Sequence, residues 1–149
     1  MTLTWISKPF TDLTLRELHD ALQLRAEVFI VEQNCAFQDI DGQDAAAHHL
    51  LGITPEGQLA AYARLFAAGQ CYEQVSIGRV VVSPAFRRYG LGKELMRTAI
   101  AHCEQLFGAQ PIKIGAQQYL TKFYQGFGFE QQGEMYLEDG IPHIYMLRA

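Results

Sequence analysis

Residues 77–96 read IGRVVVSPAFRRYGLGKELM and hold the most informative local pattern of the chain. The apolar run from Val75 to Val82 predicts a strand, which ends at Ser83-Pro84. A basic loop interrupted by glycines follows, and it opens a long helix that we expect from Gly90 to Phe107. The first turn of a helix leaves backbone N–H groups unpaired, and the helix dipole adds partial positive charge there. The stretch therefore predicts an anion-binding site between a strand and a helix.

The side chains of this loop suit a bulky anion such as a pyrophosphate. Glycines let the backbone approach the anion closely, and basic side chains supply charge at the same place. These residues are Arg87, Arg88, Gly90, Gly92 and Lys93. A nucleotide hydrolase is disfavoured, because a Walker loop requires Ser or Thr after its Lys, where this chain has Glu94. The dinucleotide fingerprint also fails, since Leu95 occupies the position of its third glycine.

The remaining elements predict a mixed sheet with helices on both faces. A helix over residues 15–29, capped by Thr14 and Glu17, and a short helix over 119–125 accompany the long one. We expect strands at 3–7, 48–53, 59–66, 75–82, 111–115, 131–137 and 142–147. The long helix between strands 75–82 and 111–115 implies a right-handed parallel crossover, and the hairpins imply antiparallel pairing elsewhere. The fold class is therefore α/β, with a mostly antiparallel sheet around one parallel pair.

Length and composition narrow the class of protein. The chain has 149 residues, a formal net charge of −4 and 49% hydrophobic residues, which predicts one domain over 1–149. The composition argues against disorder, and the mild acidity argues against a general nucleic-acid binder. No apolar stretch approaches the roughly 20 residues that span a bilayer, and no signal-peptide pattern is present, so we expect a cytoplasmic protein without a membrane partner. Three scattered cysteines indicate neither a disulfide framework nor a zinc site.

A second motif, FYQGFGF at residues 123–129, follows the predicted strand 111–115. With RRYGLG at 87–92 and the preceding Val82-Ser83-Pro84, it resembles the GNAT superfamily of N-acetyltransferases. Members of that superfamily carry R/Q-x-x-G-x-G/A after V-x-P and, later in the chain, F-Y-x-x-x-G-F. Two motifs in the right order support the resemblance.

This resemblance implies that acetyl-CoA is the cosubstrate. The positions of the histidines along the chain indicate no shared metal site. The pyrophosphate of acetyl-CoA would lie on the backbone of residues 88–93, its pantetheine arm beside residues 80–82, and its thioester between two splayed strands. The implied acetyl-CoA contacts are Val80, Val81, Val82, Arg87, Arg88, Tyr89, Gly90, Leu91, Gly92, Lys93 and Gln117. Gln117 stands where many members have Asn. Tyr124 would protonate the departing CoA thiolate, which suits a phenol with a reference pKa of about 10.

The N-terminal half narrows the resemblance to the ElaA-like subfamily. LRAEVFIVEQ at residues 24–33 and DIDGQD at 39–44 carry it, followed by His49 at a strand start. In the superfamily this region lines the acceptor site, so the resemblance implies that Glu32, Asp39 and Asp41 attract a cationic amine. A solvated turn is the alternative for the aspartates, Asp44 included.

Two questions stay open at the acceptor site. A protonated amine must lose a proton before it attacks a thioester, and the candidate bases are Glu32 and His49. Arg79 lies in an apolar strand, and a buried arginine needs a partner of opposite charge. That partner would be Glu32, Glu27 or the substrate itself.

The expected function is direct transfer of an acetyl group from acetyl-CoA to an amine of a small molecule or peptide. A cysteine intermediate is not expected, because neither motif contains a cysteine. The alternative is a non-catalytic acyl-CoA-binding or sensing module on the same fold. The resemblance also allows a homodimer through the last strands or a sheet edge.

Overall fold

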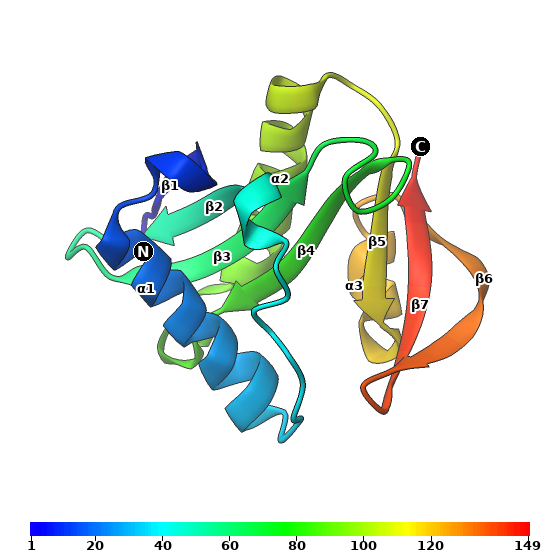
Figure 1. The fold of residues 1–149 in the computed structure, drawn as a ribbon, viewed down its shortest axis with the longest axis horizontal. Coiled ribbons are helices and arrows are strands. Elements are labelled where there is room, and N and C mark those ends of the chain that lie inside the picture. Colours follow the sequence, from blue (N-terminus) through cyan, green and yellow to red (C-terminus); the bar gives the residue numbers. More distant parts are fainter.

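The computed structural model describes residues 1–149, and its seven strands form one sheet in the order β1-β2-β3-β4-β5-β7-β6 (Figure 1). The strands are β1 (Thr4–Pro9), β2 (His48–Ile53), β3 (Leu59–Phe66), β4 (Val75–Val82), β5 (Ile112–Gln117), β6 (Phe129–Glu138) and β7 (Ile141–Arg148). The α-helices are α1 (Leu15–Arg25), α2 (Leu91–Phe107) and α3 (Thr121–Gln125). None of the helices is long and apolar enough to cross a lipid bilayer.

The pairing confirms the predicted mixed sheet. Every neighbouring pair is antiparallel except β4 and β5, which are parallel. That parallel pair is joined only at Val75–Ile112 and Ser76–Lys113, after which the two strands diverge (Figure 1). The sheet is therefore split along most of its height into an N-terminal half, β1 to β4, and a C-terminal half, β5 to β7.

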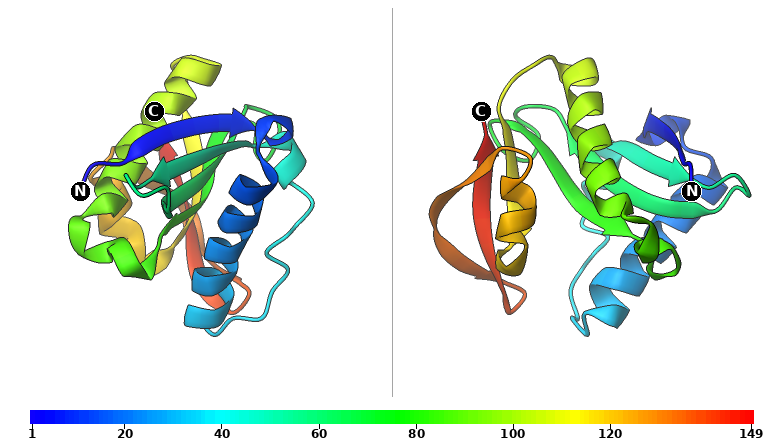
Figure 2. Two further views of the ribbon diagram at one scale, coloured as in Figure 1. Left: turned by 90° about the vertical axis from the view of Figure 1, so that its left-hand side faces the viewer. Right: turned by 180° about the vertical axis from the view of Figure 1, so that it is seen from behind.

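Helices cover both faces of this sheet (Figure 2). On one face α2 and α3 pack on both halves, with Leu95, Met96 and Tyr124 in the larger buried cluster. On the other face α1 covers only the N-terminal half, through Ala21 and Leu24 against Tyr62. The outer face of the C-terminal half next to the split therefore carries no α-helix.

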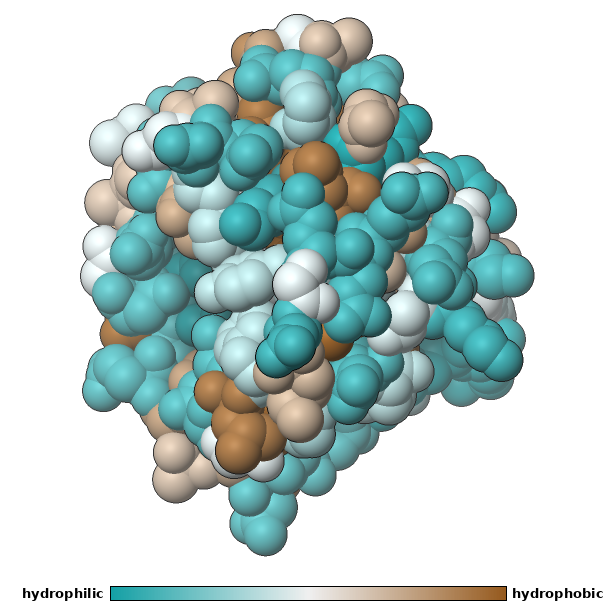
Figure 3. Space-filling view, turned by 90° about the vertical axis from the view of Figure 1, so that its right-hand side faces the viewer, coloured by the Kyte–Doolittle hydropathy of each residue, from teal (hydrophilic) through white to brown (hydrophobic).

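The edges of the sheet are β1 and β6. Figure 3 looks onto the side of β6 and β7, where hydrophilic residues cover most of the surface and apolar residues form small separate patches. Met135 and Leu137 of β6 are among the exposed apolar residues.

The first helix differs from its prediction. The capping box of Thr14 and Glu17 is present, but the α-helix ends at Arg25 and continues as a π-helix over Ala26–Glu32. Its N–H groups reach five residues back, from Gln33 to Val28 at 3.1 Å and from Cys35 to Ile30 at 3.0 Å. Apolar spacing cannot distinguish this wider turn from an α-helix, and π-turns are frequent at functional sites.

Two shorter elements also differ in extent. The strand β5 runs two residues beyond the predicted end at Gly115, to Gln117. The helix predicted over 119–125 begins as a 3₁₀ turn at Gln118–Leu120 and is α-helical from Thr121.

Candidate active site

The split in the sheet has a local cause in β4. Tyr62 faces Val81 and Arg64 faces Gly78, so β4 has one more residue than β3 over this interval. The extra residue is a β-bulge, and Arg79 within it has a φ of 49°. A bulge bends its strand and increases the local twist, which turns the end of β4 away from β5. Residues 80–82 therefore have one edge without a strand partner.

A cavity of about 650 Å³ occupies the split. It is lined by the ends of β4 and β5, by α3, by the π-helix and the loop after it, and by the β6–β7 turn. Its wall includes Val80, Val81, Val82, Arg87, Gln117 and Tyr124, which the sequence singled out. These residues come from distant parts of the chain, and the fold brings them to one space.

The anion loop leads from β4 into α2. Pro84–Tyr89 forms a 3₁₀ segment, and Gly90 has a φ of 67° directly before Leu91. This left-handed conformation favours glycine, and no side chain caps the first turn of α2. The N–H groups of Leu91, Gly92 and Lys93 are therefore available to an anion.

Two arginines of this loop already have partners. Arg87 makes a two-pronged ion pair with Glu32, with both N···O distances at 2.7 Å. Arg88 donates to the carbonyl of Ala85 at 3.1 Å, and its guanidinium lies 4.6 Å from the centre of the Tyr89 ring. The hydrogen bond from Arg87 lowers the pKa of Glu32 below its usual value, which makes this candidate base a weak one.

Tyr124 lies in the cavity wall on α3 with 7% of its surface exposed. Phe123 and Phe129 pack against its ring edge-on, at 5.1 and 6.1 Å between centroids. Burial raises the pKa of Tyr124 to about 12, so the phenol keeps its proton at neutral pH. It can therefore donate a hydrogen bond or a proton to a group in the cavity.

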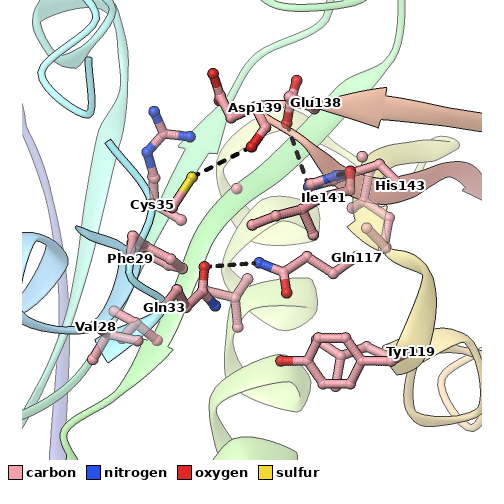
Figure 4. A pocket seen from close by; sticks show the side chains of 18 of the residues that line it. Val28, Phe29, Gln33, Cys35, Gln117, Tyr119, Glu138, Asp139, Ile141 and His143 are labelled. Atoms are coloured by element: carbon pink, nitrogen blue, oxygen red, sulfur yellow. Dashed lines mark hydrogen bonds and ion pairs between the residues drawn. The ribbon is translucent and has the colours of Figure 1, made fainter. Parts of the chain in front are cut away.

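A pair of amides spans the cavity. Gln117, at the end of β5, donates to the side-chain oxygen of Gln33 at 3.2 Å (Figure 4). Tyr119 lies on one side of this pair, and the β6–β7 turn with Cys35 lies on the other. The thiol of Cys35 reaches the carbonyl of Asp139 at 3.5 Å, so the cavity is bridged a second time.

The aspartates after the π-helix form an ionic network instead of a solvated turn. Arg25, with no exposed surface, contacts Asp39 at 3.0 Å and Asp44 at 2.7 Å. Arg64 contacts Asp44 and Asp41 from the other side. Asp39 and Asp44 are buried, and of the three aspartates only Asp41 lines the cavity.

Arg79 joins this network and not the expected glutamates. It contacts Asp39 at 2.8 Å and Asp41 at 3.4 Å, while Glu32 is taken by Arg87. Arg79 still lines the cavity beside Phe37, whose ring centre is 5.5 Å from the guanidinium. The positive charge of Arg79 is thus largely neutralised where it meets the cavity.

The fold does not bring His49 to the cavity. Its ring is fully buried, with Nδ1 at 2.6 Å from the Tyr62 hydroxyl and Nε2 at 2.8 Å from the carbonyl of Asp44. Burial also lowers its pKa. Both nitrogens are occupied, so this geometry supports a structural role for His49 and not the role of a base.

Sequence reasoning missed the residues of the β6–β7 turn. Glu138, Asp139 and His143 line the cavity opposite Cys35 and Phe37. Their order along the chain gave no sign of this, because β5 pairs with β7 and not with β6, the next strand in the sequence. The one hint in the sequence was that two acidic residues and a histidine lie close together around this turn.

Comparison with known proteins identifies the family of this chain. Residues 17–148 match the acetyltransferase (GNAT) domain family. Protein ElaA of Escherichia coli is 43% identical over 148 residues, covering 98% of this chain and 96% of ElaA. A crystal structure of an acyl-CoA N-acyltransferase from Pseudomonas aeruginosa has a TM-score of 0.93 and 47% identity, covering 99% of this chain and all of that one. The crystal structure of Escherichia coli ElaA has a TM-score of 0.91 at 42% identity, again covering 99% of this chain. The chain therefore belongs to the GNAT acetyltransferase family, in its ElaA-like group.

Proposed function

We propose that this protein transfers an acetyl group from acetyl-CoA directly to the amine of a small molecule or peptide. The observation that carries the proposal is the continuity of one cavity. It touches the anion loop at Arg87, the unpaired edge of β4 at residues 80–82, and the acidic turn at Glu138. A long cosubstrate with a charged end and a reactive end matches such a space.

The anion loop supports binding of the pyrophosphate. The free N–H groups at the start of α2 and the dipole of its 17 residues favour a negative charge there. Lys93 and Arg88 add positive charge at the same turn. The free edge at residues 80–82 matches the amides of the pantetheine arm, which would hydrogen-bond as an added strand does.

The chemistry we propose is a direct attack. The neutral amine adds to the thioester carbonyl, and N–H groups of residues 80–82 stabilise the oxyanion. The adduct then collapses, the C–S bond breaks, and Tyr124 gives its proton to the thiolate. The proton lost from the attacking nitrogen restores the Tyr124 phenol.

Replacing Gly90 by Val should abolish acetyl-CoA binding in a calorimetric titration. A β-branched side chain at a φ of 67° strains the backbone that presents the first N–H groups of α2. Gly57, in the β2–β3 turn, is the matched control, because it also has a positive φ and open space around its Cα. Gly57→Val should lose stability by circular dichroism but bind normally. Equal binding by the folded Gly90→Val protein would contradict the loop assignment.

Cys35 needs a separate test, because it lines the cavity although it lies in neither motif. Direct transfer predicts that Cys35→Ala keeps turnover within a few-fold, since the thiol only donates to the Asp139 carbonyl. Intact-mass spectra of wild type with acetyl-CoA alone should show no acetylated protein. An acetyl adduct that disappears in Cys35→Ala, together with lost turnover, would replace direct transfer by a thioester intermediate.

A further inference from the structure

The end of the cavity beyond the Gln33–Gln117 pair is lined by acidic side chains and a histidine. Here the β6–β7 turn faces the loop after the π-helix, and His143 and Glu138 point toward each other (Figure 4). His143 pairs in register with Gln117 of β5, whose side chain lies in the cavity. The imidazole is therefore one strand away from the split, and it lines the same cavity.

The hydrogen bonds of His143 fix its tautomer. Its Nδ1 lies 2.7 Å from the backbone carbonyl of Ile141, which can only accept a hydrogen bond, so Nδ1 carries a proton. In the neutral ring the lone pair is then on Nε2. That atom lies 3.4 Å from a carboxylate oxygen of Glu138. A proton taken up at Nε2 would be stabilised at once by this carboxylate.

The charges around this end are mostly negative. Asp41, Glu138 and Asp139 line it, and the one guanidinium, Arg79, is already shared between Asp39 and Asp41. Phe29 and Phe37 supply apolar wall beside these groups. Such a site favours a positively charged amine on an apolar stem over a neutral or anionic acceptor.

We propose that His143 is the base that deprotonates the ammonium group of the acceptor amine, with Glu138 as its positioning residue. This inference rests on the proposed acetyl transfer. The ammonium gives one proton to Nε2 of His143 and becomes the nucleophile. That proton leaves to solvent, while the second nitrogen proton is lost after the C–N bond has formed and restores Tyr124.

The first experiment compares His143→Gln and Glu138→Gln with wild type, using acetyl-CoA and a series of alkyl monoamines and diamines, with thiol release as the readout. His143→Gln should lower kcat/KM about 10²- to 10⁴-fold and remove the acid limb of its pH profile. Glu138→Gln should lower kcat with little change in the KM for the amine, because the imidazolium loses the carboxylate that positions it. His19→Gln, on the exposed face of α1, is the control and should match wild type.

Other titrating groups near His143 must be separated from it. Glu138 and Asp139 lie on the same turn, Asp41 and Arg79 lie across the cavity, and the Tyr136 ring lies 5.8 Å away. Burial raises the pKa of Tyr136, so this phenol does not contribute to an acid limb. An acid limb that persists unchanged in His143→Gln would assign it to a carboxylate and overturn the proposal.

A second measurement does not depend on turnover. Nitrogen-15 spectra of histidine-labelled protein, with His143→Gln used for assignment, should show the neutral ring protonated at Nδ1. A neutral ring protonated at Nε2 would overturn the inference even if acetyl-CoA binds. Failure of wild type to bind acetyl-CoA would instead contradict the proposed function.

Discussion

Tyr124→Phe should lower kcat about 10²- to 10⁴-fold while acetyl-CoA still binds. The change removes one oxygen from a ring that is otherwise held by Phe123 and Phe129. The phenol forms no hydrogen bond with the protein, so its loss leaves no buried partner unsatisfied. Because its pKa is raised to about 12, the hydroxyl is protonated at all working pH values and can supply the proton that a thiolate needs. The KM for acetyl-CoA should change little, since the anion loop is untouched.

Thiol release measures the rate, and calorimetry measures binding in the same preparations. Tyr119→Phe is the matched control, because Tyr119 also lines the cavity but is 75% exposed. It should keep kcat within a few-fold. If Tyr124→Phe turns over at the wild-type rate, another group or water protonates the thiolate. If wild type binds acetyl-CoA and acetylates no amine, the non-catalytic module becomes the better description.

Arg25→Met should destabilise the fold by about 3–5 kcal/mol, the usual cost of removing one partner from a buried ion pair. The substitution keeps a long apolar stem but leaves Asp39 and Asp44 without their most buried partner. Urea unfolding measures the loss, and the corresponding fall in Tm is roughly 10 °C for a chain of this size. Arg16→Met, on an exposed position of α1, should be nearly neutral. Equal stability of the two variants would show that the network contributes no net stability.

The same network predicts how the stability of the fold changes at acidic pH. Burial alone would raise the pKa of Asp41, but hydrogen bonds from Arg64 and the nearby positive charges lower it to about 2. The pKa of Asp44 is lowered as well, by Arg25 and Arg64, against the effect of burial. A carboxyl with a depressed folded-state pKa contributes stability above its unfolded value of about 3.9 and loses it as the pH falls. Wild-type stability should therefore fall between about pH 4 and pH 2, and less steeply in Asp41→Asn.

Local features of the sequence predicted the strand, the glycine and the helix around residues 83–90 well. The strand before the loop, the glycine before α2 and the length of that helix depend on neighbouring residues, and the structure confirms them. The adjacent residues His48 and His49 of β2 lie on opposite faces of the sheet, with His48 against Phe107 of α2 and His49 against Tyr62. The alternation of side chains along a strand does not show which face meets a cavity. The sequence therefore could not exclude His49 as a base, whereas the structure buries it away from the cavity.

Local sequence patterns could not predict the end of the cavity at the β6–β7 turn, because its residues meet only through long-range strand pairing. His143 reaches the cavity since β7 inserts between β5 and β6, an order that chain sequence does not specify. The aspartates likewise meet Arg25, Arg64 and Arg79 from three different elements, and their charge alone fitted a solvated turn equally well. The π-helix lacked a distinctive pattern in the spacing of its apolar residues.

The short parallel pairing between β4 and β5 has a consequence for thermal tolerance. Beyond its first two residue pairs with β5, the edge of β4 that faces β5 has backbone groups with no strand partner, and a bound pantetheine arm would occupy that place. A ligand that binds only the folded chain adds a stabilisation that grows with its concentration, about 2.7 kcal/mol at 100 times its Kd. The concentration of acetyl-CoA would thus affect the fraction of the protein that stays folded on heating as well as its rate of turnover.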